Sequence, residues 1–527
     1  MNDVEERWKG FGAFERTILR KIYGPNRVAT ASAEDELTNY KPQRPDPIIS
    51  ILGGDLGRWQ LFVCLWIFLS KPPTGWVQIS MTFLQADVKV TCKSGGDSNA
   101  SDICEAGCDG YDYDRSIFEQ NIVMEWDLVC DRRWLAQLQQ SLVMVGIMLG
   151  NMIMGMLADK WGRRPMFVIS CLMQLICGCL VSASPWLWFF LLMRFLDGYA
   201  TGGTMSTGFT IIMEIVGKSK RELMAILYQI PFNLGHATLP LFAYFLRHWR
   251  WYHLSFSSFS VLYIIFFWTV PESPRWLLTT GRLDKATEVL EKAAKVNKQP
   301  TERVRSDLEE AHKVLSSSTA QKGTLVDLFK HPYLCQKTLA MAFNWLVVCL
   351  VYYGVSQFLT ALTGNIFLNV FVAAIMGVPG TCICVPATKY MGRRLTLFIS
   401  NLVSGISLTL LAFGPHFGGA VRVFLATIGL FGASVTFPNV YLYAGELFPT
   451  VVRPTGVGLC SFVGRVGSIL APWIEGLKLY NIGLPPAVFG IFALLAAASV
   501  WLMPETKGYP LPETIEDGNT FGKKPKE

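Results

Sequence analysis

The charged side chains of Lys71, Arg194, Asp197 and Arg465 lie well inside long apolar stretches of this sequence. A charge inside a bilayer is costly, so such residues are candidates for a solute pathway or an ion pair. Arg194 and Asp197 are three residues apart, and this spacing predicts a pair on one helix face. An arginine fork such as that of Arg465 can bind a carboxylate through two hydrogen bonds. The alternative for Arg465 is a structural pair with Glu475 or a backbone carbonyl.

The elements that must position these charges are membrane-spanning helices. Of the 527 residues, 51% are hydrophobic and only 17% are charged, whereas a soluble chain carries about 25% charged residues. A span needs about 20 mostly apolar residues. The sequence contains twelve such stretches, near 59–84, 134–157, 165–183, 186–212, 223–246, 251–270, 337–360, 367–387, 395–413, 420–444, 455–474 and 484–503. No apolar signal segment precedes them, so the first 58 residues are predicted to be a polar segment.

Basic residues in the short connections predict the orientation. They follow the second, fourth and eighth spans, as Lys160, Arg163, Arg164, Lys218, Lys220, Arg221, Arg393 and Arg394. All would lie inside if both termini are cytoplasmic, which is the predicted topology. One patch disagrees, because Arg247, His248 and Arg250 would then lie outside. The net charge of +7 is explained by these connections and predicts no nucleic-acid partner.

A polar loop at 86–133, between the first two spans, has features of an extracellular segment. It holds four cysteines, Cys92, Cys104, Cys108 and Cys130. Four cysteines in an oxidising compartment predict two disulfides, with three pairings open. Asn99, in Asn-Ala-Ser, is a predicted glycosylation site.

A second polar insert at 271–335 divides six spans from six, and residues 282–315 are predicted to form an amphipathic helix. The predicted organisation is a cytoplasmic segment, a first half, a cytoplasmic loop, a second half and a cytoplasmic tail. Their ranges are 1–58, 59–270, 271–335, 336–503 and 504–527.

Three motifs occur once in each half and in the same order, at offsets of 230, 232 and 233 residues. The first-half members are Gly162-Arg163-Arg164, Glu214 with Arg221, and Pro271-Glu272-Ser273. The second-half members are Gly392-Arg393-Arg394, Glu446 with Arg453, and Pro504-Glu505-Thr506. Parallel six-span repeats are typical of one transporter architecture, whose binding site lies between the halves.

The repeated motifs are candidates for gating. Gly155 and Gly162 permit close helix approach around Asp159, Arg163 and Arg164, and this cluster could join helix ends in one conformation and release them in another. The alternative is that its basic residues only fix the topology. We also predict ion pairs between Glu214 and Arg221 and between Glu446 and Arg453. As surface pairs they would contribute only about 0–1 kcal/mol, but as switches they would hold a conformation.

The sequence does not favour an enzyme. It has only six His residues, and none forms a ligand-spaced pair such as HExxH, so no metal site and no cofactor are predicted. A channel or receptor would not require the repeat.

Taken together, the motifs resemble those of the organic cation, organic anion and carnitine transporter family of the major facilitator superfamily. The resemblance rests on Gly155–Arg164, Pro271–Leu278, Glu125–Asp131, Glu446–Arg453 and Pro504–Gly508. It implies an all-α membrane protein with twelve transmembrane helices in two pseudo-symmetric six-helix halves. It also implies a plasma-membrane carrier that works by alternating access on a small organic ion within the lipid bilayer. A coupling ion or counter-substrate is left open.

The chain departs from the family pattern in two places. The family loop typically has more cysteines than this one. Lys389 stands where the first half has Asp159, so the second cluster should differ electrostatically.

The resemblance also bears on the solute. The position of Arg465 is Asp in typical organic cation carriers of the family and Arg in its anion and carnitine carriers. Lys71 would add a second cation from the first half, unless it snorkels or pairs locally. Anion carriers often have a Lys in span 8, where this chain has Thr381. Aromatic and polar candidates for the pathway are Tyr352, Tyr353, Trp345, Gln357, Trp76 and Phe232.

We therefore predict substrates that bear a carboxylate, either organic anions or carnitine-like zwitterions. Aromatic faces can also hold a quaternary ammonium group, so an organic cation carrier is the alternative. A non-transporting sensor on the same fold is a further alternative.

Overall fold

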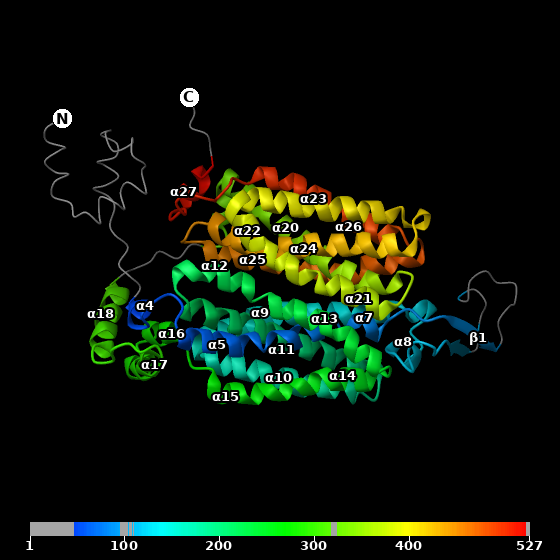
Figure 1. Cartoon of the computed structure of the whole chain (residues 1–527), viewed down its shortest axis with the longest axis horizontal. Coiled ribbons are helices and arrows are strands. Elements are labelled where there is room, and N and C mark those ends of the chain that lie inside the picture. Colours follow the sequence, from blue (N-terminus) through cyan, green and yellow to red (C-terminus); the bar gives the residue numbers. More distant parts are fainter. Residues whose placement is uncertain (1–46, 95–103, 105–107, 109, 318–323, 523–527) are drawn as a thin grey trace, which may run out of the picture. The chain divides into compact units, whose positions relative to one another are not determined.

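The computed structural model describes residues 47–94, 104, 108, 110–317 and 324–522. Asn99 and most of the N-terminal segment therefore lie outside the described residues. Long helices run side by side through the region from Pro47 onward, and shorter elements gather at their two ends (Figure 1). We call these the α17 end and the β1 end.

Twelve helical segments occupy the twelve predicted stretches. The first half contains α5 (Arg58–Phe68), α6 (Lys71–Ile79), α7 (Met81–Leu84), α9 (Trp134–Trp161), α10 (Arg163–Ser182), α11 (Leu187–Ile215), α12 (Lys218–Leu227), α13 (Ile230–Phe245), α14 (Trp249–Ser258), η2 (Phe259–Ile265) and α15 (Phe266–Thr269). The second half contains α20 (Pro332–Phe358), η3 (Leu359–Ala361), α21 (Ile366–Ile375), α22 (Gly377–Met391), α23 (Arg393–Ala412), η4 (Gly414–His416), α24 (Gly419–Leu447), α25 (Arg453–Glu475), η5 (Gly476–Leu479), α26 (Leu484–Ser499) and η6 (Val500–Leu502).

Among the described residues, eight helices are long and apolar enough to cross a membrane by themselves. Of the other four predicted stretches, one is the continuous helix α11, and three are broken into consecutive short helices, as α5–α7, α12–α13 and α14–α15. Proline explains two of the breaks, because it lacks the N–H of a helix interior and fits the first turn of a new helix. Pro72 opens α6 and Pro231 opens α13 in this way. The break between α5 and α6 places Lys71 at a helix start within the first stretch.

The β1 end is built from the loop between the first two predicted spans. Its elements are β1 (Val90–Ser94), β2 (Gly110–Tyr113), α8 (Ile122–Glu125) and η1 (Cys130–Arg132), and the two strands pair antiparallel. The sequence did not predict these strands. Disulfides join Cys92 to Cys108 and Cys104 to Cys130, which is one of the three open pairings.

The basic patch that disagreed with the predicted orientation has a local explanation. Arg250 forms an ion pair with Glu125 of α8 and donates to the carbonyls of Ser182, at 2.9 Å, and Ser184, at 2.7 Å. Its charge is thus neutralised within the β1 end, where the positive-inside rule would not place an unpaired arginine.

The α17 end contains α4 (Pro47–Ile51), α16 (Pro274–Thr279), α17 (Leu283–Val296), α18 (Val304–Ser317), α19 (Asp327–Lys330) and α27 (Ile515–Thr520). The single helix predicted for 282–315 is two helices, because the chain turns after α17 at Lys298, whose φ is +58°, ahead of Pro300. The predicted apolar face is buried through Ala286, Leu290 and Ala293. Asn297 donates to the carbonyl of Leu52 at 2.9 Å and so ties α17 to the start of the first half.

Candidate functional site

A small cavity lies between the two halves. From the first half it is lined by Met205, Gln229, Phe232 and Asn233, and from the second by Tyr352, Tyr353, Thr381, Ser434, Phe437 and Pro438. Its volume is about 20 Å³, which is room for roughly one water molecule. Three predicted pathway residues, Phe232, Tyr352 and Tyr353, meet here, and the closed volume indicates an occluded arrangement.

Hydrogen bonds cross the cavity from one half to the other. The Tyr352 hydroxyl donates to Asn233 Oδ1 at 3.0 Å, and Asn233 Nδ2 donates to Thr381 Oγ1 at 2.8 Å. The Tyr353 hydroxyl donates to Gln78 Oε1 on α6. Sequence reasoning missed Asn233 and Gln78, although an amide within an apolar stretch is itself a signal. A solute that entered between the halves at this level would have to replace these bonds.

Two buried cations stand beside this network, one from each half. Lys71 is 1% exposed, and its Nζ lies 3.9 Å from the centroid of the Tyr228 ring. Arg465 is 4% exposed and lies by Tyr353, and its Nη1 has no hydrogen-bond partner among the described residues. The positive charges of Lys71 and Arg465 act on each other. The site is therefore electropositive.

Glu475, which the sequence analysis named as an alternative structural partner of Arg465, does not pair with it. Glu475 forms an ion pair with Lys478, three residues farther along the chain. In the part of the chain that the structure describes, no carboxylate lies within ion-pair distance of Arg465. An unbalanced buried cation leaves room for an anionic group as its partner.

Aromatic rings from both halves surround the two cations. Tyr228 packs on Phe209, with centroids 5.6 Å apart, and Phe209 packs on Tyr441 at 6.4 Å. Tyr441 in turn contacts Trp345 at 4.2 Å. Trp345 thus belongs to this aromatic group but does not line the cavity, and Tyr228 and Tyr441 are pathway candidates that the sequence did not single out.

The remaining pathway candidates lie farther from the cavity lining. Gln357 is buried on α20, one turn beyond Tyr353, and its Oε1 has no partner among the described residues. Trp76 donates to Thr238 Oγ1 at 2.9 Å and packs among aromatic rings of the first half, so it is a core residue.

The predicted pair of Arg194 and Asp197 is not formed. Arg194 donates to Gln139 Oε1 at 3.1 Å and to Gln140 Oε1 at 3.4 Å, and it contacts His253 Nε2 at 3.5 Å. Both oxygens of Asp197 lack a hydrogen-bond partner among the described residues. The side-chain amides of Gln139 and Gln140 on α9 bind the guanidinium in place of Asp197. The i,i+3 spacing in the sequence did not predict these partners.

At the α17 end of the first half, Arg163 is the centre of the predicted gating cluster. Its Nη2 lies 3.0 Å from Glu214 Oε1, and its Nη1 contacts Asp159. The prediction that Glu214 pairs with Arg221 is therefore corrected, because Arg163 occupies the Glu214 carboxylate and Arg221 Nε donates to the Val216 carbonyl at 3.0 Å. The glutamate and arginine of each repeated motif are close in sequence, but the side chains that meet come from different helices.

The second half repeats this arrangement with one difference. Arg393 Nη2 lies 2.8 Å from Glu446 Oε1, whereas Arg453 Nε donates to the Phe448 carbonyl at 3.1 Å, so the predicted pair of Glu446 and Arg453 is not formed among the described residues. Lys389 occupies the position of Asp159, and Arg393 Nη1 donates to the Thr388 carbonyl at 3.3 Å instead. The predicted electrostatic difference between the clusters is confirmed.

A carboxylate caps the helix that follows each glycine of the repeat. Glu272 accepts from the backbone N–H groups of Arg163, at 2.9 Å, and Arg164, at 3.1 Å. Glu505 accepts in the same way from Arg393, at 2.9 Å, and from Arg394, at 3.1 Å. These bonds satisfy free N–H groups and complement the helix dipole. They give the repeated Pro-Glu motif a physical role that the sequence did not assign.

The basic residues beside these caps are held against aromatic rings. Arg164 donates to the Phe267 carbonyl, and its guanidinium lies 5.5 Å from the Phe267 ring. Arg394 lies 4.4 Å from the Trp501 ring and donates to the Trp501 carbonyl at 3.1 Å. Gly155 packs beside Ser206 of α11, where an added Cβ would lie 3.3 Å from Ser206 Oγ.

Ion pairs join the two halves at both ends. At the α17 end, Glu222 of α12 lies 3.5 Å from Arg393 of the second half. Burial raises the pKa of Glu222 above its usual range, and Arg393 opposes that shift. At the β1 end, Lys478 of η5 lies 2.6 Å from Asp87 of the first half. The halves are thus connected on both sides of the central cavity.

Comparisons with known proteins agree with this arrangement. A family model described as sugar (and other) transporter matches residues 111–517. An organic cation transporter protein of Drosophila melanogaster is 37% identical over 424 residues, covering 79% of this chain and 77% of that protein. The chain belongs to the organic cation, organic anion and carnitine transporter family of the major facilitator superfamily. It is therefore a multi-pass membrane transporter of small organic ions.

Other relatives of this transporter carry related names. Solute carrier family 22 member 3 of Mus musculus is 35% identical over 402 residues, covering 76% of this chain and 72% of that protein. A beta-alanine transporter of Drosophila melanogaster is 34% identical over 417 residues, covering 78% and 68%. The inward-open xylose transporter from E. coli has a TM-score of 0.63 at 16% identity, covering 88% of this chain and 99% of that one. This likeness confirms the predicted all-α major facilitator fold.

Proposed function

We propose that this transporter moves small zwitterions, in which an ammonium group and a carboxylate lie on one molecule, across the plasma membrane. The observation that carries the proposal is Arg465, a buried guanidinium whose Nη1 has no partner among the described residues and which no described carboxylate balances. A substrate carboxylate would supply the missing partner through a charge-assisted bond, which is strong in a water-poor cavity.

The ammonium end of such a substrate has partners in the rings around the site. Tyr228, Phe209 and Tyr441 present aromatic faces near the two cations. An ammonium group gains about 0.5–2 kcal/mol over such a face. A purely cationic solute would make the ring contact but would meet Lys71 and Arg465 without compensation. A zwitterion would provide a carboxylate for Arg465 and an ammonium group for the rings.

The names of the relatives support a positively charged group on the substrate. Two are named organic cation transporter or organic cation transporter-like, and one is a beta-alanine transporter, whose named solute bears both charges. They give no support to a purely anionic substrate. The organic cation therefore remains the second candidate, favoured by the rings.

For the mechanism, we propose that the ion pairs at the two ends break in turn. Release of Glu222 from Arg393 would open the α17 end, and release of Lys478 from Asp87 would open the β1 end. We place the α17 end, with both chain termini, in the cytoplasm, because the basic connections lie there and the disulfide-bearing loop lies opposite. Tyr352 and Tyr353 would exchange their bonds to Asn233 and Gln78 for bonds to the solute.

The test is counterflow with the full chain in proteoliposomes. Labelled β-alanine, tetraethylammonium and a simple monocarboxylate are compared at matched concentrations, with empty liposomes as the control. We expect saturable uptake that is fastest for the zwitterion and is accelerated by the same solute inside. Transport of tetraethylammonium alone would favour the second candidate, and transport of the monocarboxylate alone would contradict the role of the rings.

A further inference from the structure

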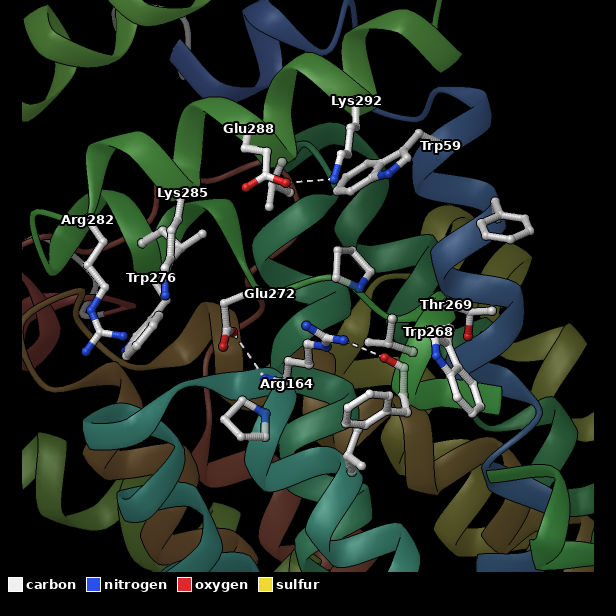
Figure 2. Close-up of a pocket in the computed structure, with 18 of the residues that line it drawn as sticks. Trp59, Arg164, Trp268, Thr269, Glu272, Trp276, Arg282, Lys285, Glu288 and Lys292 are labelled. Atoms are coloured by element: carbon white, nitrogen blue, oxygen red, sulfur yellow. Dashed lines mark hydrogen bonds and ion pairs between the residues drawn. The ribbon is translucent and has the colours of Figure 1, made fainter. Parts of the chain in front are cut away.

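A second and much larger cavity lies at the α17 end, between helices of the first half and the loop 271–335 that contains α17. Its volume is about 1230 Å³, and it shares no lining residue with the central cavity. Figure 2 shows Arg282, Lys285, Glu288 and Lys292 along α17 on one side, with Arg164 and Trp268 facing them from other elements. The cavity is therefore a space between α17 and the ends of helices that cross the membrane.

The wall formed by the membrane-crossing helices is apolar and open to the outside of the bundle. Trp268 is 73% exposed and Phe62 is 50% exposed, and Phe267 is exposed as well. Ile169 and Leu172 of α10 continue this wall along the helix. Tryptophan and phenylalanine in this position are typical of the level where a bilayer meets water. In a membrane, acyl chains would cover this wall.

The rim of the cavity is basic. Five basic residues line the cavity, Arg58, Arg164, Arg282, Lys285 and Lys292, against two acidic ones, Glu272 and Glu288. Both acids are already bound. Glu272 accepts backbone N–H groups of α10, and Glu288 pairs with Lys292 at 2.8 Å.

Three of the basic residues are available to a ligand in different ways. The side chains of Arg58 and Lys285 have neither a hydrogen bond nor an ion pair among the described residues, and both are exposed. Arg282 is fixed over the Trp276 ring, 4.8 Å from its centroid. The rim thus offers two unpaired cations and one positioned cation beside an apolar wall.

We propose that this cavity binds an anionic phospholipid of the adjoining leaflet. Its head group would lie at this basic rim, to which Arg58 and Lys285 both contribute, and its acyl chains would lie along Phe62, Ile169 and Trp268. Basic residues beside a membrane attract anionic lipids, and a positively charged pocket adds a defined place for the head group. A free phosphate compound would leave the apolar wall uncovered. The cavity also borders the gating cluster, since Arg164 and Glu272 belong to both.

The test is lipid binding by the purified full chain, measured by native mass spectrometry in detergent. Dioleoylphosphatidylserine is compared with dioleoylphosphatidylcholine, which has the same chains. The variant is Arg58→Gln with Lys285→Gln, and the matched control is Lys295→Gln with Lys298→Gln. The control removes the same charge from exposed residues on or just after α17 that do not line the cavity. Glycerophosphoserine, the head group without chains, is the soluble competitor.

We expect phosphatidylserine to bind the wild type on the order of tenfold more tightly than phosphatidylcholine. The cavity variant should lose this preference, the control should keep it, and glycerophosphoserine should not displace the lipid. Equal binding of the two lipids, or an equal loss in the control, would overturn the proposal. Displacement by glycerophosphoserine would also overturn it, in favour of a soluble phosphate ligand. All these readouts are independent of the transported solute.

Discussion

Arg393 and Glu222 connect the two halves of the transporter, with Arg393 Nη2 lying 3.5 Å from Glu222 Oε2. The same nitrogen lies 2.8 Å from Glu446 of its own half. In the first half the equivalent Arg163 is held by Glu214 and Asp159. Because Lys389 replaces the aspartate in the second half, Arg393 has one anchor fewer there and is shared with the opposite half. Among the described residues, the arginine of the duplicated motif thus pairs only within its own half in the first copy. In the second copy it also forms a contact between the halves.

Removal of this contact should favour opening at the α17 end. In Glu222→Gln the remaining bond to Arg393 is uncharged, and a partly exposed ion pair contributes about 0–1 kcal/mol. We expect the equilibrium to shift by roughly twofold to fivefold toward the state open at that end. Hydrogen–deuterium exchange of the α12 peptides should rise, while Glu310→Gln, an exposed change on α18, should leave it unaltered. Unchanged exchange in Glu222→Gln would contradict the idea that the ion pair with Arg393 holds the α17 end closed.

At the β1 end, the opposite shift is expected from Asp87→Asn. Lys478 lies 2.6 Å from Asp87, and this ion pair joins the halves on that side. Its loss should raise exchange in the η5 peptides and lower it in α12, since the proposed mechanism couples the two ends. Asp131→Asn, an exposed carboxylate of the same loop region, is the matched control. A rise in exchange in both the η5 and the α12 peptides would indicate a general loss of stability rather than coupled opening and closing of the two ends.

Alanine should not be tolerated at the two repeated glycines. Gly162 and Gly392 have φ of +121° and +89°, and an added Cβ would lie 2.4 Å from Glu272 Oε2 and 2.5 Å from Glu505 Oε2. The conformation alone costs about 1–3 kcal/mol for another residue. Gly392→Ala should lower the melting temperature in detergent, whereas Gly445→Ala, with open space around its Cβ, should not. Equal melting of the two variants would refute the capping role of Glu505.

The sequence predicted the parts of the fold that depend on periodicity and repetition. Apolar length located the twelve segments, and the spacing of motifs revealed the duplication. Partners across helices were less predictable. Glu214 was assigned to Arg221, seven residues away, and Arg194 to Asp197, because the sequence shows only near neighbours. Their actual partners, Arg163 and the glutamines of α9, are brought in by tertiary packing.

The site was predictable to a similar extent. Charge within an apolar stretch identified Lys71 and Arg465, and Tyr352 and Tyr353 followed from a motif. Asn233 is neutral and was overlooked, although its position in the hydrogen-bond network between the halves makes it as central as Tyr352. Small polar residues become informative only when the facing helix is known.

The role of Arg465 is tested most directly by its replacement. Uptake of β-alanine and of ethylamine, its counterpart without the carboxylate, should be compared in proteoliposomes that contain wild type, Arg465→Gln or Arg465→Lys. We expect Arg465→Gln to reduce kcat/KM for β-alanine by roughly tenfold to a hundredfold, as loss of a charge-assisted bond of about 1.5–3 kcal/mol implies. Ethylamine uptake should be retained or improved, and Arg465→Lys should be intermediate. An equal loss for both solutes, or no change for either, would contradict a carboxylate anchor at Arg465.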